Sequence, residues 1–547
     1  MWHIKRHVPS LYQAVLVLVS LCAAYMAGGL LGKIQEQRSE YRLTENEPLE
    51  NAPPELVLAT TALGGFRGLI IDYLWMRATE LRYQGAHYEI VQLYDWIGKL
   101  EPRLPEVWNY TAHEMVYNIS ITMPTPQERW RWVVKGIEHI RDFGLVYNQR
   151  SPKLYLQLAT IFWDKLGVNS VDEYRFYYQK RWADQMEELL GDPQNIEELA
   201  EVARLSPAWL QTPEIAEFLN AAQAINIDIV KDYFTLGNLA MPQLEQWRNL
   251  VATPKQQAIF RKVAAYLKAN RLLQQYKLDP VKMLALQAKY GAVDFRLTYT
   301  HALYWANEGI EVMRNLPEFE GTVIYANTAR ILRGSLEQNF EYGQLVSKNE
   351  NYFICIPNFA LLGPLYRLFE EHWKTWGDKD NSGMPSYETF LRQVVWYCHM
   401  YNRRKEAAKF YRILGQKFPN NPDYQQDLDT YGVQQVAGRV KYMGRRVEVE
   451  NYMLGVLLVA FHSLQLGIDQ YEGLCNFAKL MHQEYHRRHG GLEGVSPSEQ
   501  PRQFSEFQHV AGKIFYDSLI KDLGVAGGQK MWERLVTQYP FLEEFGK

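Results

Sequence analysis

The sequence predicts an all-α fold, and three observations support this prediction. Apolar residues recur at helical spacing over long stretches, beginning at Leu74. The same pattern returns around Trp108, Tyr155 and Leu391. No segment alternates apolar and polar residues over a useful length, as a half-buried strand would. Because 547 residues are too many for a single hydrophobic core, we expect two to four structural units.

The clearest early unit is a pair of helices that ends at Pro102, with Gly85 at the turn between them. Its small and apolar positions are Leu74, Ala78 and Leu81, followed by Ile90, Tyr94 and Ile97. This spacing resembles the tetratricopeptide repeat, in which two antiparallel helices each carry an apolar face that cannot be buried alone. The resemblance implies a right-handed α-solenoid of stacked helix pairs, with a groove that binds other proteins.

Later units repeat the pattern, and additional helical segments lie between them. The second unit is interrupted by residues 119–127, which contain two prolines. Residues 192–290 have helical character but do not fit the repeat. The matching positions are Trp108, Ala112 and Met115, then Tyr155, Leu158, Ala159 and Phe162, and finally Leu391, Val395, Cys398, Ala407, Tyr411, Leu414 and Pro419.

These features predict six regions along the chain. They are a membrane anchor or signal (1–33), a polar, proline-containing stalk (34–58), N-terminal repeats (59–191), an irregular helical region (192–290), C-terminal repeats (291–429) and a C-terminal helical region (430–547).

The first region is predicted from the almost wholly apolar segment 14–31. A helix of this length spans about 27 Å at 1.5 Å per residue, close to the thickness of a bilayer core. We expect an uncleaved anchor that places the body on the non-cytoplasmic side, because a long following domain is translocated largely regardless of flanking charge. The alternative is a cleaved signal at Cys22, Ala23 and Ala24, which would leave an exported soluble protein.

Composition and motifs argue against several functional classes. The net charge of −3 gives no electrostatic footprint for nucleic acid. The four cysteines form no CxxC pair or disulfide framework. No glycine-rich phosphate loop, GxSxG or HExxH motif is present, so the sequence implies no catalytic residues, no cofactor and no small-molecule substrate.

Two segments resemble metal sites incompletely. Residues 378–383 have oxygen ligands at alternate positions and a glycine at the sixth, but Thr389 stands where a calcium loop needs a glutamate. His482 and His486 share a helix face and could hold zinc with His489. The neighbouring Arg487 disfavours a cation, so a basic helix C-terminus is the better interpretation. We therefore predict no metal site.

If the repeat register is right, polar and aromatic residues of the first helix in each unit line the groove. Such residues suit a peptide-binding surface, since rings supply area and polar groups fix orientation. The alternative is that inserted helices fill the groove and these residues pack internally. The residues are Asp72, Trp75, Thr79, Arg82 and Tyr83, then Glu106, Asn109, His113 and Tyr117, then Lys153, Thr160 and Trp163, and finally Arg392, Trp396 and His399.

The functional hypothesis is a non-catalytic scaffold that assembles a multi-subunit complex at or near a membrane. Its partners would be other protein subunits or peptide segments, and the membrane if residues 14–31 are retained. One alternative is an integral structural subunit of an enzyme, transporter or filament assembly, with contacts through broad outer surfaces. A third is a metal-dependent enzyme that uses the His482 cluster.

Overall fold

The structure is a computed structural model. It describes Val19, Cys22, Gln37 and residues 67–546, with the exception of 320, 350–352, 377–382, 444–445, 466 and 490–502. The apolar segment 14–31 and the stalk 34–58 otherwise lie outside the described residues. The chain divides into two compact units, Met1–Glu101 and Pro102–Lys547. Among the helices that the structure describes, none is both long enough and apolar enough to cross a membrane.

The first unit contains one helix pair, α3 (Arg67–Gln84) and α4 (His87–Leu100). Gly85 occupies the turn with φ of +71°, a conformation that glycine adopts without steric cost. The two helices contact each other, and their apolar faces are buried. The buried positions include Leu74, Ala78, Leu81, Ile90, Tyr94 and Ile97, as the periodicity predicts.

The second unit begins with helices that contain π-helical turns. Pro105, Pro126 and Pro152 each start a helix, because proline lacks the N–H that the first turn leaves unbonded. The elements are α5 (Pro105–His113), π-helix η2 (Glu114–Ile119), 3-10 helix η3 (Ser120–Thr122), α6 (Pro126–Glu138), π-helix η4 (His139–Gly144), α7 (Leu145–Tyr147), α8 (Pro152–Thr160), π-helix η5 (Ile161–Lys165) and α9 (Arg175–Leu190).

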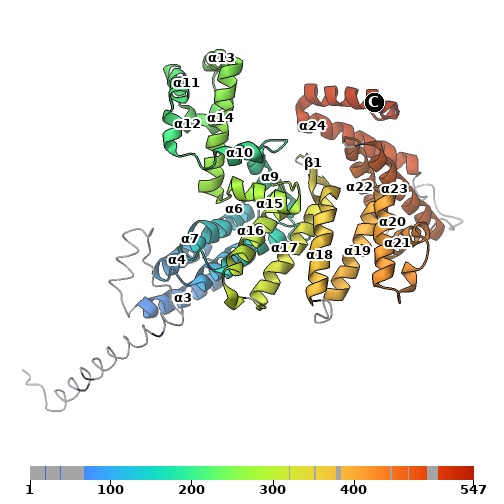
Figure 1. Cartoon of the computed structure of the whole chain (residues 1–547), viewed down its shortest axis with the longest axis horizontal. Helices are drawn as coiled ribbons and strands as arrows, with labels where there is room; N and C mark the ends of the chain where they lie inside the picture. Colours follow the sequence, from blue (N-terminus) through green and yellow to red (C-terminus); the bar gives the residue numbers. More distant parts are fainter. Residues whose placement is uncertain are drawn as a thin grey trace, which may run out of the picture. The chain divides into compact units, whose positions relative to one another are not determined.

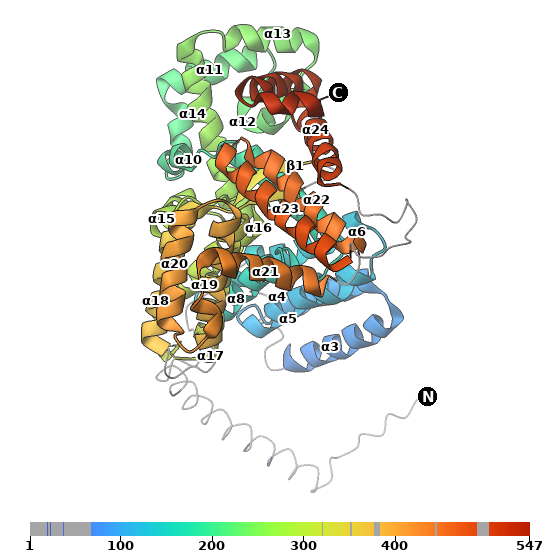
Figure 2. The same ribbon diagram turned by 90° about the vertical axis from the view of Figure 1, so that its right-hand side faces the viewer.

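The next helices include a group with its own small core. Figures 1 and 2 both show α11–α14 extending away from α16–α20. Ile215, Phe218, Trp247 and Val263 belong to a separate buried cluster there. The helices are α10 (Ile196–Val202), α11 (Pro213–Ala224), α12 (Ile229–Asp232), α13 (Met241–Leu250), α14 (Pro254–Arg271), continued by π-helix η8 (Leu272–Tyr276), and α15 (Pro280–Tyr290).

The remaining helices pack largely against their sequence neighbours. Helix α8 contacts α16, after which α16 contacts α17, α17 contacts α18, α18 contacts α19 and α19 contacts α20. Helix α22 contacts α23 and α24. The bounds are α16 (Thr298–Arg314), α17 (Val323–Tyr342), α18 (Leu362–Trp376), α19 (Gly383–Met400), α20 (Arg404–Lys417), α21 (Leu428–Tyr442), α22 (Arg446–Ser463), α23 (Ile468–His489) and α24 (Phe504–Gln538).

The described part of the chain is almost entirely helical, which confirms the all-α prediction, with one small exception. Strands β1 (Gln344–Lys348) and β2 (Phe353–Ile356) form an antiparallel ribbon that the sequence analysis does not predict. Each strand is too short for a clear alternation. Ile354 and Ile356 are buried, and the ribbon contacts α9, α17, α22 and α24. It therefore fills a position where several helices meet.

Candidate partner-binding site

One pocket of the second unit includes a residue of the predicted groove, Tyr117. Its volume is about 390 Å³, within the range of ligand sites in proteins. It lies where η2, η3, α6, η5 and the segment after η5 come together. The lining residues are Tyr117, Ile121, Arg129, Asp164, Lys165, Ser170, Val171, Asp172 and Glu173.

Two π-helical turns supply side chains at the centre of this pocket. Tyr117 lies in η2, and Asp164 and Lys165 lie in η5. The two turns contact each other and continue α5 and α8 without a break. A π-helical turn holds more residues than an α-helical turn, so it changes the direction in which the following side chains point. Such turns are frequent at functional sites.

A buried ion pair forms one wall of the pocket. The Lys165 Nζ atom lies 2.6 Å from the Asp172 carboxylate, and each side chain is only 4% exposed. The Lys165 ammonium also donates a hydrogen bond to the Ser120 hydroxyl at 3.1 Å. Arg129 lies 3.8 Å from Asp172 and 3.1 Å from Glu173. These residues therefore neutralise one another's charges.

The pKa of Asp172 reflects this arrangement. Burial alone would raise that pKa, since it disfavours the charged form. The hydrogen bonds from Lys165 and from the Tyr174 backbone, with the charges of Lys165 and Arg129, outweigh burial and lower the pKa. Asp172 is therefore charged at neutral pH, and the wall is held together electrostatically.

Asp164 is the remaining charge in the pocket. It is exposed, and it forms no ion pair with any described residue. Two cations (Arg129 and Lys165) and three carboxylates (Asp164, Asp172 and Glu173) leave one net negative charge among the lining residues. Burial, together with the Asp164 charge, raises the pKa of the Tyr117 hydroxyl. The pocket thus presents one uncompensated carboxylate beside a neutral phenol.

Aromatic and apolar side chains share this pocket with Asp164 or lie next to it. The rings of His113 and Tyr117 are stacked, with centroids 4.6 Å apart. Ile121 and Val171 line the pocket and are exposed large hydrophobic residues. Apolar side chains exposed beside a polar pocket are typical of binding surfaces.

The other predicted residues near these helices have structural contacts. Lys153 pairs with Glu106 at the surface. The Thr160 hydroxyl donates a hydrogen bond to the Leu156 carbonyl at 2.7 Å. Trp163 packs against Gly334 of α17, where an added Cβ would lie 3.1 Å from the indole nitrogen. A further buried atom, the Asn109 Oδ1, has no hydrogen-bond partner among the described residues.

Two of the three predicted residues on α19, Trp396 and His399, are covered by later helices. Trp396 is 6% exposed; its ring meets Phe477 at 5.0 Å, and the Arg439 guanidinium lies over it at 4.3 Å. His399 packs against Gly432 of α21, and burial lowers its pKa. Arg392 lies beside Tyr424 and Tyr431 but is exposed. Trp396 and His399 therefore pack within the second unit, whereas Arg392 remains at its surface.

The predicted residues of α3 belong to the first unit. The Trp75 ring lies 5.6 Å from the Tyr94 ring of α4. Asp72, Arg82 and Tyr83 are exposed.

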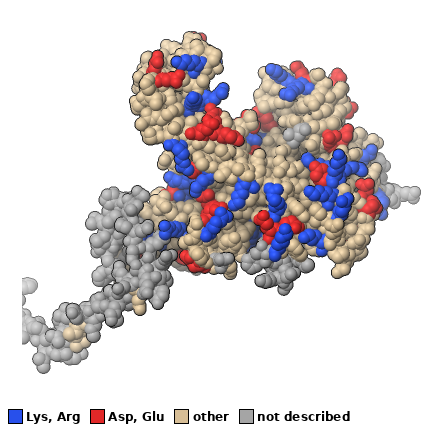
Figure 3. All heavy atoms as spheres, in the orientation of Figure 1, with Lys and Arg blue, Asp and Glu red and all other residues tan. Residues whose placement is uncertain are grey.

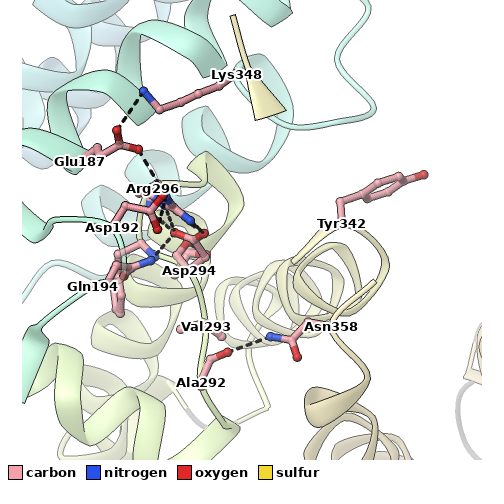
Figure 4. Close-up of polar contacts among 12 residues, drawn as sticks. Glu187, Asp192, Gln194, Ala292, Val293, Asp294, Arg296, Tyr342, Lys348 and Asn358 are labelled. Atoms are coloured by element: carbon pink, nitrogen blue, oxygen red, sulfur yellow. Dashed lines mark hydrogen bonds and ion pairs between the residues drawn. The ribbon is translucent and has the colours of Figure 1, made fainter. Parts of the chain in front are cut away.

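Figure 4 shows a second polar cluster, centred on Arg296. This guanidinium is 9% exposed and lies 2.8 Å from Asp294, 2.9 Å from Asp192 and 3.3 Å from Glu187. Glu187 also lies 3.3 Å from Lys348 of β1. Each of these charges has an opposite partner, so we assign the cluster to structure: it holds β1 and the segment before α16 against α9.

The metal candidates remain incomplete among the described residues. Residues 378–382 and the side chain of His489 lie outside the described part. The Nε2 atoms of His482 and His486 are 3.1 Å apart. Among the residues described, no three His, Cys, Asp or Glu side chains are grouped as metal ligands would be.

Of the residues that line this pocket, the sequence analysis names Tyr117 but not Asp164, Lys165 or Asp172. Asp164 and Lys165 lie in π-helix η5, where the 3.6-residue spacing used for the prediction does not hold. Spacing alone therefore could not have located the pocket. The chain matches no protein-family model and no curated protein. The geometry of the site is thus the basis on which its function is judged.

Proposed function

We propose that this protein is a non-catalytic scaffold that binds partner proteins, with stacked helix pairs resembling a tetratricopeptide-type, right-handed α-solenoid. The succession of contacts from α8 to α16, and then from each helix to the next through α20, supports this arrangement. In solenoids each repeat contacts mainly its neighbours, which creates extended surfaces for partners. The apolar segment 14–31 would anchor the scaffold, with the body on the non-cytoplasmic side.

The observation that carries the proposal is the carboxylate of Asp164, which has no ion-pair partner among the residues that the structure describes. A partner's lysine or arginine side chain would neutralise it inside the pocket. Ile121 and Val171, which are both exposed, would contact apolar neighbours in the partner. We therefore propose a partner segment with a basic residue flanked by apolar ones.

The chemistry of the pocket favours binding over catalysis. Ser120 and Lys165 lie 3.1 Å apart, a pairing that in some hydrolases activates the serine. Here the lysine ammonium is held by Asp172, so it is not available as a base. Ser120 is also fully buried, which keeps a substrate away from its hydroxyl.

A labelled peptide tests the proposal. The peptide carries one arginine between two leucines in a Gly/Ser background, and its binding to the full chain is followed by fluorescence anisotropy. We expect saturable binding that weakens about tenfold in Asp164→Asn, since a hydrogen bond to a charged group contributes about 1.5–3 kcal/mol. Glu217→Gln removes an exposed carboxylate elsewhere and should leave affinity unchanged. Equal binding of a peptide with glutamine in place of arginine would contradict the proposal.

One observation favours the second candidate, a structural subunit with contacts through outer surfaces. Leu69, Tyr73, Met76 and Tyr83 are all more than 60% exposed and follow one face of α3. If this face carries the contacts, Tyr73→Ser with Met76→Ser would release partners that Asp164→Asn retains. Quantitative mass spectrometry of the purified complex distinguishes the two candidates.

A further inference from the structure

A second pocket lies elsewhere in the same unit, where α15, α16, α17 and α18 converge. Its volume is about 370 Å³, and it shares no lining residue with the Tyr117 pocket. Its lining is part basic and part apolar or aromatic. The residues are Lys289, Tyr290, Ile310, Arg314, Tyr325, Ala329, Leu332, Arg333, Pro364, Arg367, Leu368 and Glu371.

Each of the four helices contributes one cation to this pocket: Lys289, Arg314, Arg333 and Arg367. This convergence is not part of a broad basic surface. On the face drawn in Figure 3, basic and acidic side chains are interspersed across the described residues. On that face, therefore, the basic residues do not form one broad patch.

Carboxylates neutralise only part of this charge. Glu311 lies 3.4 Å from Lys289 and 2.6 Å from Arg314, and Glu371 lines the pocket itself. Four cations and two carboxylates leave a charge of about +2. Glu337 also acts on Arg333, but burial raises the pKa of Glu337 to about 7, so it is only partly charged at neutral pH.

The arginines differ in how they are held. Arg333 is half-buried, and its guanidinium lies over the Phe369 ring at 5.3 Å. Such stacking fixes the plane of the guanidinium. Arg367 is exposed and forms no ion pair or hydrogen bond with other described residues. The pocket thus contains one positioned guanidinium and one that is free to bind an anion.

We propose that this pocket binds a phosphate monoester attached to an apolar or aromatic group. A monoester carries about −1.5 to −2 charges at pH 7, which matches the excess positive charge better than a single carboxylate does. Arginine forks fit phosphate oxygens bidentately. Ile310, Leu332 and Leu368 would contact the apolar body of the ligand. The proposal is independent of the Tyr117 pocket, so either can fail alone.

Phenyl phosphate is the probe, titrated into the full chain by isothermal calorimetry. We expect saturable binding that weakens about tenfold or more in Arg367→Gln, the loss typical of a charge-assisted hydrogen bond. Glu371→Gln removes a competing negative charge and should strengthen binding several-fold. Arg330→Gln is the matched control. Arg330, on α17, is exposed like Arg367 but does not line the pocket.

The outcomes separate the proposal from non-specific attraction. No saturation by the wild type up to about 10 mM, beyond the weak end of specific binding, would overturn it. An equal loss in Arg330→Gln and Arg367→Gln would also overturn it. Inorganic phosphate binding as tightly as phenyl phosphate would refute the role of the apolar lining. A phosphotyrosine peptide that binds more tightly than phenyl phosphate would identify a phosphorylated partner as the source, and equal binding would indicate a small phosphorylated molecule.

Discussion

Lys165 and Lys153 both pair with a carboxylate, but in opposite surroundings. Lys165 and Asp172 are each 4% exposed, whereas Lys153 and Glu106 are each about half exposed. Exposed pairs are screened by water and contribute little. Removing one partner of a buried pair leaves an uncompensated charge in the interior. The two lysines therefore form a matched comparison of the pocket wall with the surface.

Lys165→Met should destabilise the second unit by about 3 kcal/mol or more, because it leaves Asp172 buried without its nearest cation. Lys153→Met should change stability by less than about 1 kcal/mol. Urea unfolding followed by circular dichroism measures both. Similar effects of the two substitutions would contradict the structural role assigned to Lys165.

Individual residues were the hardest features to predict from the sequence. Helical periodicity predicts His113 and Tyr117 on one face of a helix, and the rings of these two residues stack. It could not place Asp164, because η5 departs from α-helical geometry. Nor could it anticipate that Trp396 is covered, since the covering Phe477 lies 81 residues further along the chain.

At the scale of elements, close approach of α6 to η2 helps to shape the pocket. An added Cβ at Gly136 would lie 2.4 Å from the Val116 side chain and 3.0 Å from the Ala112 carbonyl oxygen. Both neighbours are fully buried, so neither can move easily. Glycine is required here for helix packing and not for an unusual backbone conformation.

Gly136→Ala should therefore destabilise the protein by about 1–3 kcal/mol, the usual cost of overpacking a core. Gly438→Ala in α21 is the control, because an added Cβ there meets nothing within 4 Å. That change should be neutral or stabilising by up to about 1 kcal/mol, since alanine favours helices. Thermal unfolding of both variants tests this; a stable Gly136→Ala would show that the contact relaxes.

Long helices with a regular spacing of apolar residues were predictable from the sequence, and short elements were not. The pairs α3–α4 and α19–α20 bury the positions expected from the repeat. Prolines at the starts of α11, α14 and α15 agree with their role as helix starts. The strands β1 and β2 span five and four residues, too few for a period to be recognised.

The stability of the whole molecule should depend on pH through two acids of α17. Burial raises the pKa of Glu337 to about 7, against the opposing charge of Arg333. Burial and the Glu337 charge raise the pKa of Glu341 to about 8. Both acids bind protons more tightly in the folded state than in the unfolded state, where a pKa near 4.5 applies. Their stabilising effect is complete below about pH 4.5 and is lost as pH rises through 7 and 8.

The free energy of unfolding of the wild type should accordingly fall as pH rises from 5.5 to 8.5. The reference is a double variant, Glu337→Gln with Glu341→Gln, which lacks both acids. The difference should be about 2–5 kcal/mol, since each pKa unit corresponds to about 1.4 kcal/mol. Urea titrations at the two pH values measure it, with Glu217→Gln as an exposed control. A difference that is independent of pH would mean that both acids are already charged in the folded protein.

The arrangement of the whole chain was beyond sequence reasoning. Helix α8 packs directly against α16, although α9–α15 lie between them in sequence. Repeat spacing describes neighbours along the chain, so it cannot show that packing of each helix on the next resumes after such an insertion. The same limit applies to the phosphate pocket, which requires four helices to be placed together.

The most direct test of the central claim is photo-crosslinking at the rim of the Tyr117 pocket. The full chain carries a photoreactive residue in place of the fully exposed Val171, and crosslinked peptides are identified after purification from the native cells. The account predicts a crosslink to a partner peptide that has a lysine or arginine close to the crosslinked position. This crosslink should be lost in Asp164→Asn and should not form when the photoreactive residue replaces Val323. A crosslink that persists unchanged in Asp164→Asn, or partner peptides without a basic residue, would contradict it.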